Sequence, residues 1–163
     1  VESEFGFRFK CELPSRQDLY ELDEVLAAVD IMFPVIEVVG SRWEGGLGNV
    51  GPLRLVADMV SHTGLVTGPE ITNWREIDLP SQTITLYKNG EGIVEGKGAN
   101  TLGSPLFVLE WTANHLSARG ESIAAGEIIS TGTCTGITPV VSGDELIADF
   151  GEIGKVKLRI TEQ

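Results

Sequence analysis

Three glutamate residues in two separate stretches of the sequence are the first candidates for chemistry. Glu2 and Glu4 lie two residues apart in the run Val1–Phe7, where acidic and apolar residues alternate as in a half-buried β-strand. Because successive side chains on a strand point to opposite faces, the two carboxylates share one face, and Phe5 and Phe7 share the other. Like charges side by side in a sheet are destabilising. Either that face is solvated, as on an edge strand, or a cation lies between the carboxylates.

The third glutamate, Glu37, lies in the run Phe33–Gly40, which is otherwise apolar and rich in β-branched residues. Such a run predicts an interior strand. A carboxylate there has to be paired, protonated or bound to a metal, because an unpaired charge in apolar surroundings is costly. An ion pair with Arg42 or Arg54 is the plainer alternative. Three carboxylates without a neighbouring His or Cys are hard oxygen ligands, which suit Mg²⁺ or Mn²⁺ with water in the remaining positions, and not zinc.

The composition limits the class of protein. The chain has 163 residues, the length of one domain, and 42% of them are hydrophobic, which is enough to bury a core. Its formal net charge of −12 argues against nucleic acid and anionic membrane surfaces as partners, since phosphate contacts need clustered Lys and Arg. No apolar run approaches the length of a membrane span, and no signal segment is visible.

The cysteines and the first residue carry further expectations. Cys11 and Cys134 lie far apart, which predicts buried, reduced thiols in a cytoplasmic protein and no disulfide framework. The chain starts with Val inside the stretch that carries Glu2 and Glu4. We therefore expect that an upstream N-terminal segment is absent and that residues 1–163 form a single catalytic domain.

Three stretches are predicted to be helical. Gln17–Asp30 has apolar residues near helical spacing, and Ser15 or Asp18 is its expected N-cap. A shorter helix is expected over Leu53–Val60. The clearest helical pattern covers Pro105–Arg119, with proline at the start and glycine directly after the end.

The remaining pattern is that of short strands. Thr83–Tyr87 and Ile93–Gly96 flank an Asn-Gly pair, which is the strongest short hairpin signal in the chain. Further strands are predicted at Leu65–Gly68, Glu127–Ser130, Thr138–Val141, Glu145–Phe150 and Lys155–Thr161. The glycine-rich loop at residues 40–48 is expected to be mobile or to approach a ligand closely. Together these elements predict a single α+β domain, rich in β-structure, with two or three helices packed on sheet.

Six short motifs follow one another in the sequence, and Ile153–Val156 closes the series. The six are Glu2–Glu4, Val35–Arg42, Val56–Asp58, Gly98–Pro105, Ile129–Thr133 and Gly143–Phe150. Each is weak alone, but in this order they resemble the fumarylacetoacetate hydrolase superfamily over nearly the whole chain. The closest resemblance is to its branch of 2-keto-4-pentenoate hydratases and 4-oxalocrotonate decarboxylases. The resemblance implies a mixed β-sheet roll of the superfamily's C-terminal type, a divalent metal and a short 2-oxo acid as substrate.

The resemblance also assigns ligands. Carried over by motif, Glu2, Glu4 and Glu37 are the metal ligands, in agreement with the charge argument above. The metal, Mg²⁺ or Mn²⁺, would hold the 2-oxo oxygen and one carboxylate oxygen of the substrate and would stabilise a dienolate. Thr133 would bind the substrate carboxylate.

Asp58 and Ser61 are the candidate catalytic residues that the resemblance implies. They match the hydratase pattern Ala-Asp-Asn-Ala-Ser, in which Met59 and Val60 replace the asparagine and the second alanine. Ser61 would also line the substrate pocket, and Arg42 is the further candidate for substrate binding.

Each of these residues has a plainer alternative. Asp58 is equally well explained as a helix cap or a solvated helix residue, and Ser61 and Thr133 as ordinary turn residues. Arg42 either orients the third glutamate or lies along the surface. His62 stands where the family usually has a small polar residue, and we expect it to be structural and not a base.

The function implied by the resemblance is that of a lyase. A hydratase would add water to a short 2-hydroxydienoate or 2-oxo-4-enoate from aromatic catabolism, through the metal-stabilised dienolate. Glu37, where the hydrolase branch has aspartate, and the lack of a lysine between Lys10 and Lys88 favour this branch over C–C bond hydrolases. Two alternatives remain open: a decarboxylase of a 2-oxo-3-enedioate, of the 4-oxalocrotonate type, and a catalytically impaired partner subunit of such an enzyme. The resemblance further implies a homo-oligomer, or pairing with a decarboxylase subunit.

Overall fold

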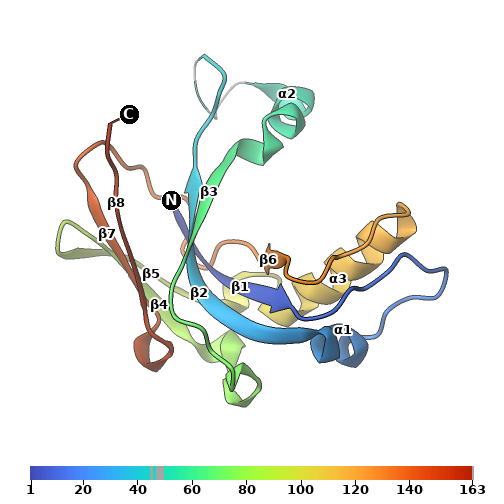
Figure 1. Cartoon of the computed structure of the whole chain (residues 1–163). Helices are drawn as coiled ribbons and strands as arrows, with labels where there is room; N and C mark the ends of the chain where they lie inside the picture. The colour runs from blue at the N-terminus through green and yellow to red at the C-terminus, as the bar shows by residue number, and fades with distance from the viewer. Residues whose placement is uncertain (45, 47–49, 163) are drawn as a thin grey trace.

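Two four-stranded β-sheets and three α-helices make up the part of the chain that the structure describes (Figure 1). This computed structural model describes residues 1–44, 46 and 50–162. Residues 45 and 47–49 belong to the predicted glycine-rich loop, so the prediction made for that loop lies outside the described residues there. The predicted α+β, β-rich fold with two or three helices is confirmed.

The first sheet carries the three candidate glutamates. Its strand order is β3-β2-β1-β6, with the bounds β1 (Glu2–Phe9), β2 (Val29–Val39), β3 (His62–Thr67) and β6 (Ile128–Ser130). β1 lies between β2 and β6 and is antiparallel to both. The alternative of a solvated edge strand is therefore wrong, because β1 has hydrogen-bonded neighbours on both sides.

The second sheet lies beside the first. Its order is β5-β4-β7-β8, with the bounds β4 (Thr83–Lys88), β5 (Glu91–Lys97), β7 (Glu145–Asp149) and β8 (Lys155–Arg159). The predicted hairpin is confirmed as β4 and β5. All named strand pairs of the described chain are antiparallel, so the two sheets are more uniform than the mixed roll that the resemblance implied. β2 contacts both β7 and β8, which joins the sheets (Figure 1).

The helices occupy opposite ends of the first sheet. They are α1 (Leu22–Ala28), α2 (Gly51–Ala57) and α3 (Pro105–Ala118). α1 and α3 contact each other at one end, and α2 stands at the far end of β2 and β3 (Figure 1). α2 buries none of its residues. Short 3₁₀ turns complete the fold at Met59–Ser61, Trp74–Glu76, Leu79–Ser81, Gly98–Asn100 and Gly151–Ile153.

The predicted helix Gln17–Asp30 is much shorter in the structure. Only α1 is helical, and β2 begins directly after it because the residues that follow are β-branched and aromatic and complete the sheet. The N-cap is Glu21, which forms a reciprocal capping box with Glu24. Ser15 and Asp18, the predicted caps, lie outside this arrangement.

Two other predictions are corrected. Thr138–Val141 is not a strand. It shares a pair of backbone hydrogen bonds with Val1, at 2.8 and 2.9 Å, in place of a ladder. Both cysteines are free, but only Cys134 is buried and Cys11 is exposed. Burial raises the pKa of the Cys134 thiol to about 11.

The core fixes the position of β1. Its alternate residues Phe5, Phe7 and Phe9 are fully buried. Phe5 packs edge-on against Phe150 with ring centroids 5.3 Å apart, and Phe7 against Trp74 at 5.5 Å. Buried aromatic pairs of this geometry stabilise beyond their buried area alone. The strand therefore has one face anchored in the core and one face free to carry polar groups.

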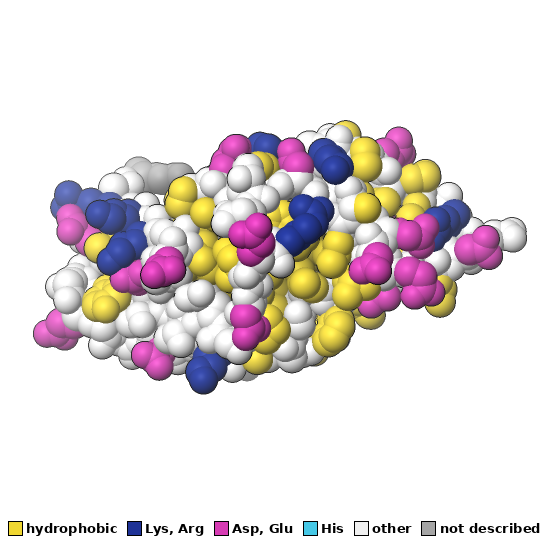
Figure 2. Space-filling view, turned by 90° about the horizontal axis from the view of Figure 1, so that it is seen from below, with side chains coloured by type: hydrophobic (Ala, Val, Ile, Leu, Met, Phe, Trp, Pro, Cys, Tyr) yellow, Lys and Arg dark blue, Asp and Glu magenta, His cyan; other side chains and the backbone are white. Residues whose placement is uncertain are grey.

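The surface reflects the composition. Figure 2 shows acidic side chains spread among basic and hydrophobic ones over the face seen from below, in line with the net charge of −12. Among the described residues, none of the helices has the length and apolar character needed to cross a membrane.

Candidate metal centre

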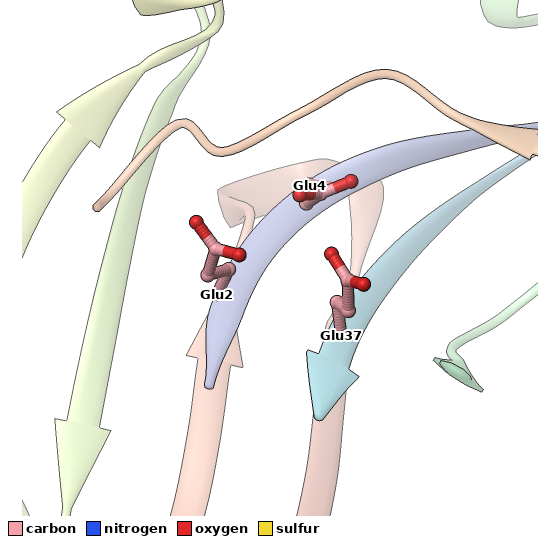
Figure 3. Close-up of side chains that lie close together, drawn as sticks. All are labelled: Glu2, Glu4 and Glu37. Carbon is pink, nitrogen blue, oxygen red and sulfur yellow. The ribbon is translucent and has the colours of Figure 1, made fainter. Parts of the chain in front are cut away.

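The strand register brings the three glutamates together. In the antiparallel pair of β1 and β2, Glu2 lies directly opposite Glu37, and Glu4 lies opposite Val35. Because residues two apart on a strand share a face, all three carboxylates project from the same side of the sheet. Each offers an oxygen within 4.8 Å of the others (Figure 3). We call Glu2, Glu4 and Glu37 the acidic triad.

The surroundings of the triad penalise negative charge. Glu4 is only 2% exposed, and Glu2 and Glu37 are half-buried. Burial is the largest cause that raises the pKa of Glu4 to about 7; the charges of Glu37 and Glu2 add to this rise, and hydrogen bonds from Ser130 and Gly132 oppose it. Burial and then the charge of Glu37 also raise the pKa of Glu2. The ion pairs of the described Lys and Arg side chains all lie elsewhere. Three crowded oxygen ligands without a balancing Lys or Arg fit a hard divalent cation.

Each carboxylate of the triad also interacts with a hydrogen-bond donor from outside it. The backbone N–H of Gly132 donates to Glu4 Oε2 at 3.0 Å. The hydroxyl of Thr133 lowers the pKa of Glu2 by hydrogen bonding and so offsets part of its rise. Nδ1 of His62 lies 2.8 Å from Oε1 of Glu37. These donors come from two segments, the loop after β6 and the start of β3.

The loop after β6 is held along β1 by hydrogen bonds. The N–H and the hydroxyl of Thr131 both donate to the carbonyl of Phe5, at 3.0 and 3.1 Å, and the N–H of Cys134 donates to the carbonyl of Ser3 at 2.8 Å. Gly132 has a φ of +96°, which strongly favours glycine. The loop thereby presents its N–H to Glu4.

The same loop is seated on a glycine of β5. A Cβ added at Gly96 would lie 2.0 Å from the carbonyl oxygen of Cys134, so the loop would have to move. We expect Gly96→Ala to lower the free energy of unfolding by at least about 2 kcal/mol and to weaken Mn²⁺ binding as well. Gly92→Ala, on the same strand but with its nearest contact at 3.4 Å, is the matched control. Urea denaturation and Mn²⁺ titration of both variants test this; equal behaviour of the two would contradict it.

Asp58 and Arg42 form a cluster of their own. The Asp58 side chain is 1% exposed and pairs with Nη1 of Arg42 at 2.8 Å. It also accepts hydrogen bonds from the Ser41 hydroxyl and the Arg42 N–H, both at 3.1 Å. The Arg42 guanidinium is the main reason why the pKa of Asp58 is lowered. Arg42 therefore binds Asp58, and the alternative of an ion pair between Glu37 and Arg42 is wrong.

The turn between Asp58 and β3 is strained. Met59, Val60 and Ser61 have φ values of 51°, 54° and 67°, in the left-handed region that such residues rarely adopt. Ser61 is fully buried, and its hydroxyl has no hydrogen-bond partner in the described part of the chain. The structure thus places Asp58 and Ser61 in a buried turn beside the start of β3, while their roles in catalysis or substrate binding stay predictions.

A cavity adjoins the triad on the side of the loop after β6. It has a volume of about 440 Å³ and is lined by Asn100, Thr101, Leu102, Val108, Trp111, Thr131, Gly132 and Thr133. Two of these residues, Gly132 and Thr133, also contact the triad. The described lining residues carry no charged side chain. Thr133, the predicted substrate ligand, is therefore placed between the carboxylates and a cavity with an apolar wall.

Sequence reasoning gave Gly132 no role and expected His62 to be only structural, without a contact to the triad. Gly132 stands inside the quoted motif Ile129–Thr133, where glycine flanked by two threonines was the available signal. His62 contacts Glu37 because a bulge between Val38 and Val39 shifts the register of β2 and β3. Nothing in the sequence marks that bulge.

The sequence match defines the family. Residues 14–161 match the family model described as the C-terminal domain of fumarylacetoacetate hydrolase. This match covers most of the chain, and the chain belongs to that family. The matched region contains Glu37 and begins after Glu2 and Glu4.

Relatives with described activities include two kinds of enzyme. The chain is 35% identical over 159 residues to a 4-oxalocrotonate decarboxylase of Pseudomonas sp. strain CF600, covering 98% of this chain and 59% of the relative. It is 34% identical over 160 residues to a 2-keto-4-pentenoate hydratase of Paraburkholderia xenovorans strain LB400, covering 96% and 57%. The chain thus spans less than two thirds of the length of these relatives.

A solved relative shows the same architecture. The structure of 4-oxalocrotonate decarboxylase from Pseudomonas putida G7, complexed with magnesium and adipate, superposes with a TM-score of 0.86 at 36% identity, covering 98% of this chain and 59% of that chain. The same decarboxylase has also been solved with calcium and acetate. The family resemblance drawn from the motifs is confirmed.

Proposed function

We propose that this chain carries the catalytic centre of a divalent-metal-dependent lyase that acts on a short 2-oxo acid, and that the reaction is hydration of a 2-hydroxydienoate. The observation that carries the proposal is the acidic triad beside an uncharged cavity. The magnesium and calcium in the related decarboxylase structures support the presence of a divalent metal.

The residues of the chain have separable tasks in this proposal. Glu2, Glu4 and Glu37 would hold the cation, Mg²⁺ or Mn²⁺, which when bound would supply Lewis-acid polarisation of the 2-oxo group. Thr133 would bind the substrate carboxylate. Its hydroxyl oxygen accepts the N–H of Gly136 at 2.8 Å, and its hydroxyl proton is shared with Glu2, so a substrate carboxylate would have to take the place of Glu2 as acceptor. Asp58 would hold Arg42 and the turn containing Ser61 in place.

The cavity favours a substrate with an uncharged far end. A 2-oxo acid that is anchored at the triad and at Thr133 would extend along Leu102, Val108 and Trp111. A second carboxylate placed there would gain no cationic partner from the described lining residues, which is a disadvantage for a dicarboxylate. The five-carbon 2-hydroxydienoate of a hydratase has an apolar end and meets no such penalty.

The second candidate is decarboxylation of a 2-oxo-3-enedioate. Its support is the similarity to the two decarboxylases, one of which was solved with adipate, a dicarboxylate. Both reactions develop negative charge on the 2-oxo oxygen, so the triad alone serves either one.

Turnover assays on the purified protein with Mg²⁺ test the proposal. We expect conversion of 2-hydroxypenta-2,4-dienoate to the 4-hydroxy-2-oxo acid, with little turnover of a 2-oxo-3-enedioate. CO₂ release from the dicarboxylate would establish the decarboxylase in its place. Tight metal binding without turnover of either would indicate an impaired partner subunit. Glu37→Gln is the control that removes any metal-dependent signal.

A further inference from the structure

We propose that His62 is a positioning residue for the metal centre: its Nδ1–H donates to Oε1 of Glu37 and leaves the other carboxylate oxygen directed to the cation. The inference rests on the proposed metal site and extends it. The carrying observation is the distance of 2.8 Å between His62 Nδ1 and Glu37 Oε1. This contact joins β3 to β2 across the register bulge.

The backbone of His62 is held from both sides. It pairs with Val39 at the start of β3, and its carbonyl accepts a hydrogen bond from Nη2 of Arg42 at 3.0 Å. Arg42 is itself fixed by its ion pair with Asp58. The cluster of Asp58 and Arg42 therefore sets the place from which the imidazole reaches Glu37.

His62 acts on Glu37 and not on the metal directly. The group of side chains whose ligand atoms all lie within 4.8 Å of one another contains the three glutamates and not His62. No ring nitrogen of His62 therefore lies within 4.8 Å of the ligand oxygens of all three glutamates. A carboxylate that binds metal is typically itself hydrogen-bonded to a partner behind it.

The role of His62 completes a pattern. Glu4 is held by the N–H of Gly132, and Glu2 interacts with the hydroxyl of Thr133. Glu37 lies on β2 close to the end of the strand, where the following loop begins. Without a donor its carboxylate would be free to rotate away from its two neighbours, which repel it. Fixing its orientation lowers the cost of assembling three like charges around a cation.

Three substitutions at His62 distinguish the effect of losing the hydrogen-bond donor from the effect of losing the volume of the ring. The side-chain amide N–H of asparagine can occupy the place of Nδ1, whereas alanine and leucine offer no donor. We expect His62→Ala and His62→Leu to weaken Mn²⁺ binding by about tenfold or more, and His62→Asn to retain most of the affinity. His115→Ala is the matched control, because the chain has two histidines and His115 lies on α3, stacked on Trp111.

A second measurement, NMR, tests the contact between His62 and Glu37 first in the metal-free protein and then with Mn²⁺ added. Long-range ¹H–¹⁵N NMR of the two imidazoles should show His62 protonated at Nδ1, and added Mn²⁺ should broaden the signals of His62 much more than those of His115. Thermal unfolding of each metal-free variant confirms that it is folded.

The outcomes are distinct. Unchanged affinity in His62→Ala, equal losses in His62→Ala and His62→Asn, or an Nδ1 without a proton each overturn the proposal for His62 while the metal site stands. Failure of the unmodified protein to bind Mn²⁺ overturns the metal site and the positioning role together.

Discussion

Glu4→Gln is expected to abolish measurable metal binding and leave the fold intact. Glu4 is the most buried member of the triad, and its amide analogue keeps the shape while removing the charge that attracts the cation. The loss should exceed the 10–100-fold that is typical when a partner behind the ligands is changed, and we expect about 100-fold or more. The substitution should not destabilise the metal-free protein, because it removes a buried charge.

Isothermal titration with Mn²⁺ and thermal unfolding in EDTA measure the two effects. Glu95→Gln removes the same charge at an exposed position of β5, in the other sheet, and serves as the control. Binding by Glu4→Gln within threefold of the unmodified protein would show that the triad is not the metal centre.

The metal-free protein is expected to lose stability as the pH rises from about 4.5 to 7. Glu4 has a pKa of 4.5 when unfolded and about 7 when folded, chiefly through burial. In this pH range the native state holds a proton that the unfolded chain has released, so the free energy of unfolding falls with rising pH. The two pKa values correspond to a loss of about 3 kcal/mol, complete above pH 7.

Glu2, whose pKa is also raised by burial, adds to the same decline, whereas Asp144 acts in a different pH range. Hydrogen bonds from the Val141 N–H and from Lys88 and Asn89 lower the pKa of Asp144 to about 2, so the stability that Asp144 provides is lost only in stronger acid.

Urea denaturation at several pH values in EDTA should therefore show the decline in stability between about pH 4.5 and 7, and Glu4→Gln should reduce it. Saturating Mg²⁺ should reverse the trend, because the cation binds the deprotonated triad. A flat profile shared by both proteins in EDTA would contradict the assignment.

The sequence was most informative where local pattern and burial agree. Alternation in β1 and the apolar run around Glu37 predicted two strands with carboxylates on a defined face, and the structure brings the three together. The hairpin of β4 and β5 and helix α3 carry strong local signals and were predicted closely.

Tertiary contacts decided the rest. The helix predicted over Gln17–Asp30 is shortened at both ends: Val29 and Asp30 belong to β2, and before α1 the N–H and carbonyl of Tyr20 are hydrogen-bonded to the side chain of Asn114 on α3. Asp58 matched a motif, but its partner Arg42 comes from the other side of a loop. The contact of His62 with Glu37 depends on a bulge that only strand pairing reveals.

One strand, β1, supplies both the buried aromatic anchors of the fold and two members of the triad, on opposite faces. The two sets of side chains therefore meet different requirements, one for folding and one for the proposed metal site. A lineage freed from the need for turnover would lose Glu2 and Glu4 early, since their removal relieves repulsion, while Phe5 and Phe7 would persist for as long as the chain must fold. Inactive descendants of this protein should thus be recognisable by neutral residues at positions 2, 4 and 37 within an otherwise preserved strand.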